Sequence, residues 1–292
     1  MNDGKVVVVT GASGGFGRLI AETLARTGYR VFATMREIHT RNAPIAAEIA
    51  ALAQREALSL QILEVDVTDE ESVARAIEAV IASCGRIDIV VNNAGNAILD
   101  LAETVTPTQA QRLFDTNFFG VLRMNRAVLP VMKTQRSGLL LHVSSGAGRL
   151  AIPTMGLYCA SKFAMEALAE VYRYELAALG IDSVVLEPGA YPTPLMAKLA
   201  RGEDPSRQAG YGAVAGLPEK VTTLLAGSKA NPQEIADSVL QIIETPAGQR
   251  RLRYRVAAND LGVTRINAVT DAAQAQLLEA FGISEVTRFR KH

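Results

Sequence analysis

The sequence contains little cysteine. Its two cysteines, Cys84 and Cys159, are too few for the disulfide framework that stabilises small secreted proteins. We therefore expect both thiols to be free, packed as small hydrophobic groups in a protein of a reducing compartment.

Long apolar runs and an excess of one charge are also absent. No stretch reaches the 18 or so apolar residues of a membrane span. The apolar run at 6–9 is too short and starts too early for a signal peptide. Thirty basic residues balance thirty acidic ones, unlike the basic excess typical of proteins that bind nucleic acid or membrane surfaces. We expect a cytoplasmic protein with no nucleic-acid partner and no membrane span.

What the chain does contain is an alternation of short β-branched runs with helical patterns. Apolar residues make up 49% of the 292, and no repeat, linker or low-complexity block divides them, which predicts one domain over 1–292. Predicted strands cover 5–9, 30–34, 60–65, 87–91, 139–143, 183–187 and 252–256. Predicted helices lie between and after them, at 15–26, 43–56, 70–83 (capped by Thr68), 108–135, 156–179, 233–244 and 271–281.

This order predicts an α/β fold: a Rossmann-type, doubly wound parallel sheet of about seven strands with helices on both faces. Ligands of such sheets bind at the carboxyl ends of the strands. The chemical motifs of the sequence follow those strand ends.

The first strand runs into a glycine-rich turn, Thr10-Gly11-Ala12-Ser13-Gly14-Gly15-Phe16-Gly17. Glycines at 11, 15 and 17 let the backbone turn tightly and approach a pyrophosphate, and the next helix offers free N–H groups at its positive end. A plain tight turn would have a similar sequence, so the turn alone does not establish a nucleotide site.

The pattern Thr10-Gly11-x-x-x-Gly15-x-Gly17 resembles the cofactor motif of the short-chain dehydrogenase/reductase family. The resemblance implies nicotinamide cofactor binding, with a ribose-reading residue about 20 positions further on. Arg36 stands there and favours NADP(H), because a guanidinium matches a 2′-phosphate in charge and shape. The alternative is a solvated Arg36 neutralised by Glu37.

The second predicted strand also carries a resemblance. Its sequence Val31-Phe32-Ala33-Thr34-Met35-Arg36 resembles that of the hydroxysteroid and retinol dehydrogenase branch, which implies a bulky apolar ketone or alcohol as substrate.

Two more strand ends match the family. Asp66-Val67 follows the third strand, where the resemblance implies a bond from Asp66 to the adenine amino group; a helix-capping Asp is an equal alternative. Asn92-Asn93-Ala94-Gly95 follows the fourth. The resemblance adds Asn93, Ala94 and Gly95 to the cofactor site, together with Ser13 and Phe16 of the first turn.

The chemistry is predicted to lie in Tyr158-Cys159-Ala160-Ser161-Lys162. Residues four apart share a helix face, so the phenol and the ammonium can point into one site. A nearby cation lowers the pKa of a tyrosine, which suits Tyr158 as the acid/base. The resemblance implies that Ser145, thirteen residues earlier, orients the substrate, although Ser144 is a neighbouring candidate. It also implies that Asn117 interrupts a long helix and holds a water against Lys162.

Pro188-Gly189-Ala190-Tyr191-Pro192-Thr193 matches the family's P-G-x-x-x-T. The resemblance implies that Pro188, Gly189 and Thr193 contact the nicotinamide end of the cofactor, which Tyr158 and Lys162 also contact. We predict no metal ligand. Residues 190–230 would form a substrate lid, with glycines that suit motion and with Leu195, Met196, Leu199, Tyr211, Val214 and Leu217 lining a pocket or packing on the core. Residues 231–292 would add a helix-strand-helix extension.

The sequence therefore predicts an NADP(H)-dependent oxidoreductase, a ketone reductase that transfers hydride between the nicotinamide and a small-molecule carbonyl or secondary alcohol. Alternatives are an epimerase or dehydratase on the same fold, and a non-catalytic NADP-binding redox sensor. The Ala- and Leu-rich outer faces of the two long helices allow a homodimer or homotetramer without requiring one.

Overall fold

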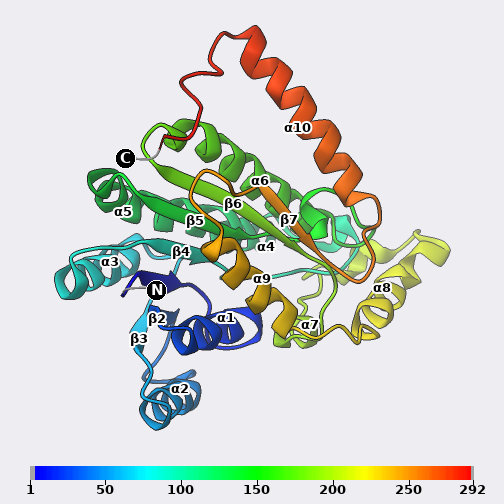
Figure 1. Cartoon of the computed structure of the whole chain (residues 1–292). Coiled ribbons are helices and arrows are strands. Elements are labelled where there is room, and N and C mark those ends of the chain that lie inside the picture. Colours follow the sequence, from blue (N-terminus) through cyan, green and yellow to red (C-terminus); the bar gives the residue numbers. More distant parts are fainter. Residues whose placement is uncertain (1–3, 291–292) are drawn as a thin grey trace.

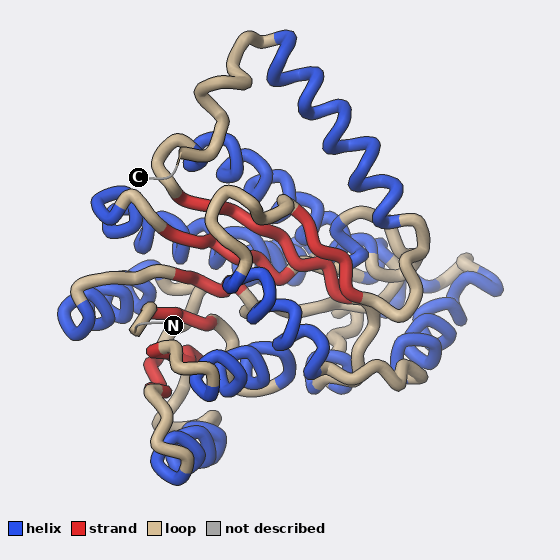
Figure 2. Tube along the Cα trace, viewed as in Figure 1, coloured by secondary structure: helices blue, strands red, loops and turns tan. Residues whose placement is uncertain are grey.

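A seven-stranded parallel sheet forms the centre of the computed structural model, which describes residues 4–290 (Figures 1 and 2). Residues 1–3 and 291–292 of the predicted domain lie outside the described part. The strand order is β3-β2-β1-β4-β5-β6-β7. The strands are β1 Val6–Val9, β2 Arg30–Met35, β3 Leu60–Glu64, β4 Ile89–Asn92, β5 Gly138–Val143, β6 Ile181–Pro188 and β7 Arg253–Val256.

The central strands β1, β4 and β5 are largely apolar because both faces of the sheet are covered. In β1, Val7 and Val9 belong to the core on one face, whereas Val6 and Val8 belong to the core on the other. On the first face lie α1 (Gly15–Arg26), α2 (Ala43–Arg55) and α9 (Gln233–Glu244); α3 (Glu70–Cys84), α5 (Gly120–Gln135) and α6 (Gly156–Ala177) cover the second. The predicted fold class, a single doubly wound domain, is confirmed.

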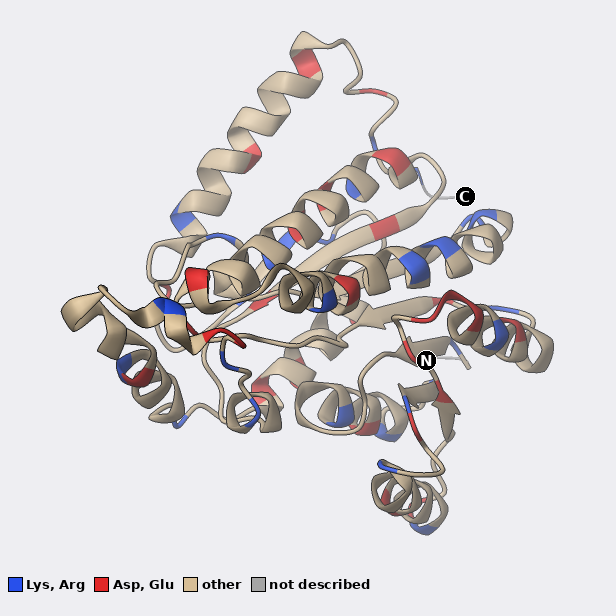
Figure 3. Cartoon of the chain, turned by 180° about the vertical axis from the view of Figure 1, so that it is seen from behind, with Lys and Arg blue, Asp and Glu red and all other residues tan. Residues whose placement is uncertain are grey.

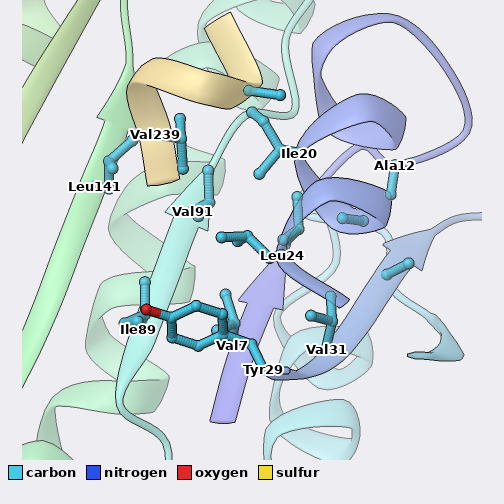
Figure 4. Close-up of a cluster of buried hydrophobic side chains, with 14 of the residues drawn as sticks. Val7, Ala12, Ile20, Leu24, Tyr29, Val31, Ile89, Val91, Leu141 and Val239 are labelled. Atoms are coloured by element: carbon cyan, nitrogen blue, oxygen red, sulfur yellow. The ribbon is translucent and has the colours of Figure 1, made fainter. Parts of the chain in front are cut away.

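Figure 4 shows the first of these cores at close range. Ile20 and Leu24 of α1 and Val239 of α9 meet Val91 and Leu141 of the central strands. A helix from the start of the chain and one from its last quarter thus share one core, which fixes β1 relative to the C-terminal part.

The predicted helix at 108–135 is interrupted. Residues Pro107–Phe114 form α4, Asp115–Phe119 form a π-turn, and α5 follows. Inserted π-turns of this kind are frequent at functional sites.

The predicted Thr68 cap of α3 is wrong. Asp69 caps this helix by accepting hydrogen bonds from the backbone N–H groups of Glu71 and Ser72, while Thr68 bonds to Asp66.

The segment after β6, predicted as a lid, contains helical structure. It contains α7 (Pro194–Ala197) and α8 (Leu217–Ala226).

The last helix, α10 (Val263–Ala280), begins before the predicted residue 271. The chain turns at Gly262, which has a φ of 83°, and the Asp260 carboxylate accepts a hydrogen bond from the backbone N–H of Thr264 in the first turn. Figures 1 and 3 show α10 projecting from the body, and Figure 3 shows basic and acidic residues interspersed. Within residues 4–290 no helix has the length and apolarity to cross a membrane.

Candidate functional site

A pocket of about 910 Å³ opens at the carboxyl ends of the strands. Its walls come from the glycine-rich turn, from the loops after β2 to β6, and from the segment around α7 and α8. All but three of the predicted site residues line this pocket. The three exceptions, which lie behind its wall, are Thr10, Gly17 and Asn117.

The glycine-rich turn is held by close packing that leaves no space for side chains. A Cβ on Gly17 would lie 2.4 Å from Nδ2 of Asn93 and 2.4 Å from the carbonyl oxygen of Gly11. Gly11 has a φ of 68°, and a Cβ there would lie 2.8 Å from the Cα of Ala94. These glycines therefore allow the loops after β1 and β4 to touch.

Thr10 and Asn93 join the same two loops by hydrogen bonds. The Thr10 hydroxyl oxygen accepts from the backbone N–H groups of Asn93 (2.9 Å) and Ala94 (3.0 Å). The Asn93 amide donates to the carbonyls of Thr10 (2.8 Å) and Gly11 (3.2 Å). This places Ser13, Gly15, Phe16 and Gly95 along one wall of the pocket.

A charged corner lies at the ends of β2 and β3. Arg36 is half exposed, and its Nη1 lies 3.9 Å from the Asp66 carboxylate. Asp66 also accepts from the hydroxyl and the backbone N–H of Thr68, so it holds its own turn and does not cap α3. Val67 lines the pocket beside it, and so does Arg41, a second basic residue that we did not predict.

The loop after β6 closes the pocket from the other side. The N–H of Gly189 donates to the carbonyl of Val256 on β7 (2.8 Å). Pro188 and Thr193 line the pocket. The position of a Cβ on Gly15 would be 3.6 Å from Thr193, so the glycine-rich turn and this loop face each other at van der Waals distance.

Tyr158 and Lys162 meet inside the pocket. The Lys162 ammonium lies 5.9 Å from the centre of the Tyr158 ring and donates to the carbonyl of Val143 (2.9 Å). Burial raises the pKa of Tyr158 to about 12, although a hydrogen bond with Ser145 lowers it. Burial lowers the pKa of Lys162 to about 8, against the attraction of Glu166. The sequence predicted that the nearby ammonium would lower the pKa of Tyr158. In the structure, burial raises this pKa by more than any lowering from the ammonium.

The two candidate serines have different partners. Ser144 is buried, and its hydroxyl donates to the Glu166 carboxylate at 2.7 Å. Ser145 bonds to the Tyr158 hydroxyl and accepts from the N–H of Ala147. Both serines line the pocket, and Ser145 is the one with a hydrogen bond to Tyr158.

Asn117 lies in the π-turn between α4 and α5, so the predicted break of the long helix coincides with it. Its side chain is buried, and both of its amide N–H groups and its amide oxygen have partners. The amide oxygen accepts from the N–H of Asn96 (2.8 Å), and the amide nitrogen donates to the Asn96 carbonyl (2.9 Å) and the Ser161 hydroxyl (3.0 Å). Asn117 therefore fixes the loop after Gly95 against α6, one residue from Lys162.

A clamp that we did not predict holds the segment before α8. The Gln109 amide donates to the carbonyl of Arg201 (2.6 Å) and accepts from the N–H of Glu203 (3.2 Å). Asp100 accepts from the N–H of Gly202 (3.0 Å). A Cβ on Gly202 would lie 2.1 Å from Thr104, so this glycine serves packing. No local pattern marks these partners, which are 92, 94 and 102 residues apart.

The apolar wall of the pocket comes from both sides of this clamp. Of the residues predicted to line it, Leu195, Met196 and Leu199 do so. Tyr211 instead bonds to Glu103 through its hydroxyl. Further apolar side chains of the wall include Ala97, Ile98, Leu113, Leu150, Ile152, Met155 and Leu225.

The chain is similar in sequence to known proteins. A family model described as short chain dehydrogenase matches residues 5–204. The chain is 35% identical to 3-ketodihydrosphingosine reductase of Bacteroides thetaiotaomicron over 189 residues, 65% of either chain. It is 33% identical to retinol dehydrogenase 8 of Bos taurus over 264 residues, 86% of this chain and 82% of that one.

A solved structure extends the similarity to the whole chain. A short-chain dehydrogenase from Streptomyces avermitilis superposes with a TM-score of 0.76 at 30% identity, over 98% of this chain and 99% of that one. The sheet and its helices, together with the C-terminal part, thus have a counterpart in an experimental structure.

Proposed function

The chain belongs to the short-chain dehydrogenase family, and we propose that it is an NADP(H)-dependent oxidoreductase that interconverts a carbonyl and a secondary alcohol. The observation that carries this proposal is the meeting of Tyr158, Ser145 and Lys162 in a pocket that begins at a glycine-rich turn. When bound, the nicotinamide supplies or accepts the hydride.

The residues present fit a dinucleotide. Gly14 and Gly15 line the pocket at the start of α1, and no side chain caps this helix, so bare backbone faces the pocket where a pyrophosphate binds. We propose that the cofactor is held by the turn and by the loops after β2, β3, β4 and β6, through Thr10, Gly11, Ser13, Gly15, Phe16, Gly17, Arg36, Asp66, Val67, Asn93, Ala94, Gly95, Pro188, Gly189 and Thr193, and by Tyr158 and Lys162.

Tyr158 is proposed to hold and deliver the proton. With its pKa raised to about 12 by burial, the phenol is protonated at neutral pH and can donate to a developing alkoxide. Ser145 bonds to the same phenol and can donate to the same oxygen, stabilising its negative charge. Lys162 supplies the positive charge that the resulting phenolate needs.

Asn117 is proposed to support a proton path to Lys162. Both of its amide N–H groups have partners, so a water could bond to the second lone pair of the amide oxygen or to the backbone of the π-turn. The segment 190–230 is proposed as the substrate lid, because its Leu199 and Leu225 join the apolar cluster around Tyr158. The apolar wall suits a bulky apolar carbonyl compound or alcohol, and one relative, retinol dehydrogenase 8, is named for such an alcohol. Cytoplasmic location and self-association stay predictions.

Preference for NADP(H) is proposed from the charged corner. Arg36 and Arg41 line the pocket near the end of β2, and Arg36 faces the single carboxylate of Asp66 at 3.9 Å, too far for a close pair. A 2′-phosphate would meet two guanidinium groups there. We expect Arg36→Asp to shift the ratio of kcat/KM for NADPH over NADH by about 100-fold toward NADH. An unchanged ratio would contradict the assignment.

The oxidoreductase proposal is tested by NADPH oxidation with a panel of ketones. Replacing Tyr158 with Phe should lower kcat by about 10³-fold and change the NADPH dissociation constant far less, because the proton donor is removed while the other proposed cofactor contacts remain. Tyr211→Phe is the matched control, since that phenol bonds to Glu103 outside the pocket, and it should keep full activity. Activity that survives Tyr158→Phe would remove the residue from its role. NADPH binding without turnover of any carbonyl would favour the redox sensor.

A further inference from the structure

Two arginines of β7 have opposite electrostatic surroundings. Arg253 and Arg255 are two residues apart and so point to the same face of the strand. The Arg253 guanidinium contacts the carboxylates of Glu170 (2.6 Å), Glu166 (3.1 Å) and Asp271 (3.3 Å). Within residues 4–290, no carboxylate oxygen lies within 4.0 Å of the Arg255 guanidinium, so its charge is not neutralised by a direct partner.

Arg255 uses part of its hydrogen-bonding capacity on the backbone. Nη1 donates to the carbonyl of Glu187 (2.9 Å), and Nη2 donates to the carbonyl of Asn259 (3.3 Å). Nε is buried and has no partner within the described residues. A guanidinium has five N–H donors, so these two hydrogen bonds leave other N–H groups of Arg255 available to a ligand. The carbonyl contacts alone would explain a brace between β6 and the loop before α10, but they leave the charge unpaired.

The position of Arg255 connects it to the reacting end of the pocket. Arg255 lines the pocket together with Leu261 and Val263. A Cβ on Gly146, the residue after Ser145, would lie 2.8 Å from Nη1, and a Cβ on Gly189 would lie 3.8 Å from Nη2. The guanidinium therefore lies between the loop that carries Ser145 and the loop after β6.

A half-buried cation without a counterion is unfavourable. Burial lowers the pKa of Arg255, and the more distant carboxylates of Glu187 and Asp260 only partly oppose this. A compact anion in the pocket would offset the desolvation cost, and a carboxylate matches the planar fork of a guanidinium.

We propose that Arg255 binds an anionic group of the substrate, so that the substrate class is a carbonyl or hydroxy compound with an apolar body and a carboxylate near the reacting carbon. This inference rests on the proposed function. An anion site at Arg255 would restrict the proposed substrate class from bulky apolar compounds to amphiphilic ones. The apolar wall formed by Ile98, Ile152 and Leu199 would receive the body, and Arg255 would receive the charge.

The first experiment measures binding, without turnover. With NADP⁺ present, calorimetry compares 2-naphthoate and decanoate with their primary amides, on wild type, Arg255→Met and Arg255→Lys. We expect wild type to bind each carboxylate at least 10-fold more tightly than its amide. Arg255→Met should lose that preference and Arg255→Lys should keep part of it. Lys198→Met, which removes another cation of the pocket wall, is the control and should keep it. Unfolding temperatures establish that each variant is folded.

Each result of this binding experiment decides the inference. Equal affinity for carboxylate and amide in wild type, a preference that survives Arg255→Met, or no carboxylate binding at millimolar concentration would overturn it. If Arg255→Met does not fold, the comparison of Arg255→Lys with wild type decides, because a structural brace alone would leave the carboxylate preference of the folded variant unchanged.

Turnover separates this inference from the proposed function. Keto acids and their methyl esters are tested as substrates with NADPH. Reduction of the esters with the same kcat/KM as the acids would contradict the role of Arg255 and keep the oxidoreductase. Carboxylate binding that depends on Arg255, together with no reduction of any carbonyl compound, would support the anion site and contradict the oxidoreductase.

Discussion

The two halves of the pocket are built by different means. In the cofactor half, formed by residues 10–17 and the loops after β2, β3 and β4, backbone lies against backbone, as at Gly17 and Gly11. In the substrate half, formed by residues 97–115 and 195–225, side chains reach across to hold a separate segment, as Gln109 does with Arg201 and Glu203. Backbone packing tolerates almost no substitution, whereas side-chain clamps can be replaced one at a time. We therefore expect the cofactor half to fail abruptly when altered and the substrate half to loosen gradually.

The largest effect is expected at Gly17. In Gly17→Ala the new Cβ would overlap Nδ2 of Asn93 and the carbonyl oxygen of Gly11, both 2.4 Å away. Because backbone cannot move aside cheaply, the free energy of unfolding should fall by about 3 kcal/mol, and NADPH binding, followed by its fluorescence, should be lost.

Gly14→Ala is the matched control for this substitution. A Cβ on Gly14 would meet Pro194 at an ordinary 3.6 Å, and the residue has an extended φ of 172°. We expect this variant to stay within about 1 kcal/mol of wild type. A stable Gly17→Ala variant that binds NADPH normally would show that the cofactor half is not built as rigidly as the packing indicates.

Lys162, at the boundary of the halves, should show the next largest effect. Lys162→Met should lower kcat by about 10³-fold because the phenolate loses its cation. Its burial should also make wild-type stability depend on pH. The folded pKa of about 8 lies below the ordinary value of 10.5, so between pH 8 and 10 the unfolded chain binds more protons than the folded one. Wild type should therefore gain up to about 3 kcal/mol of stability as pH rises through this window.

The measurement is urea unfolding at several pH values. Subtracting the Lys162→Met curve removes the titration of the other groups, so the difference should rise with pH from 8 to 10. A difference that is flat over that range would mean that the ammonium is solvated in the folded protein. In that case Tyr158 would not share a dry site with Lys162.

The contrast between the halves also explains what could be predicted from the sequence. The cofactor half is encoded in contiguous motifs at strand ends, so Thr10, Gly11 and Gly17, and Asn93 after β4, could be predicted to meet once parallel strands were expected. Tyr158 and Lys162 share a helix face by spacing alone. The number of strands follows from the same alternation, but their spatial order does not, because doubly wound sheets occur in more than one order.

The substrate half could not be predicted in this way. Gln109 is an ordinary polar residue in a helical pattern, and its partners lie more than 90 positions away. Arg255 belongs to no motif, and only the fold brings β7 beside the loop of Ser145. Gly202 looked like a flexible lid glycine, although it packs against Thr104. Such contacts depend on the tertiary arrangement and not on local propensity.

A moderate effect is expected when the clamp is opened. Gln109→Ala removes both bonds to the segment at 201–203, each worth about 1 kcal/mol, so KM for the ketone should rise about 10-fold. The KM for NADPH should stay the same, because the cofactor half does not depend on the clamp. Limited proteolysis should cut within 200–226 faster than in wild type.

Gln111→Ala, an exposed substitution on the same helix, is the control for the clamp and should change none of these quantities. If Gln109→Ala weakened NADPH binding as much as ketone binding, the two halves would be coupled. The separation drawn between them would then be wrong.

The smallest effect is expected from Arg41, the side chain that extends the cofactor half beyond its motifs. Arg41→Met removes one of two cations near the proposed 2′-phosphate, a loss of about 0.5–1 kcal/mol for a solvated charge, so KM for NADPH should rise about threefold. The KM for NADH should not change, because NADH lacks that phosphate. Arg55→Met, at the far end of α2, is the control, and the effect should shrink as salt rises. An equal rise for NADH would mean that Arg41 shapes the loop, and a change above 10-fold would place it among the strict requirements of the cofactor half.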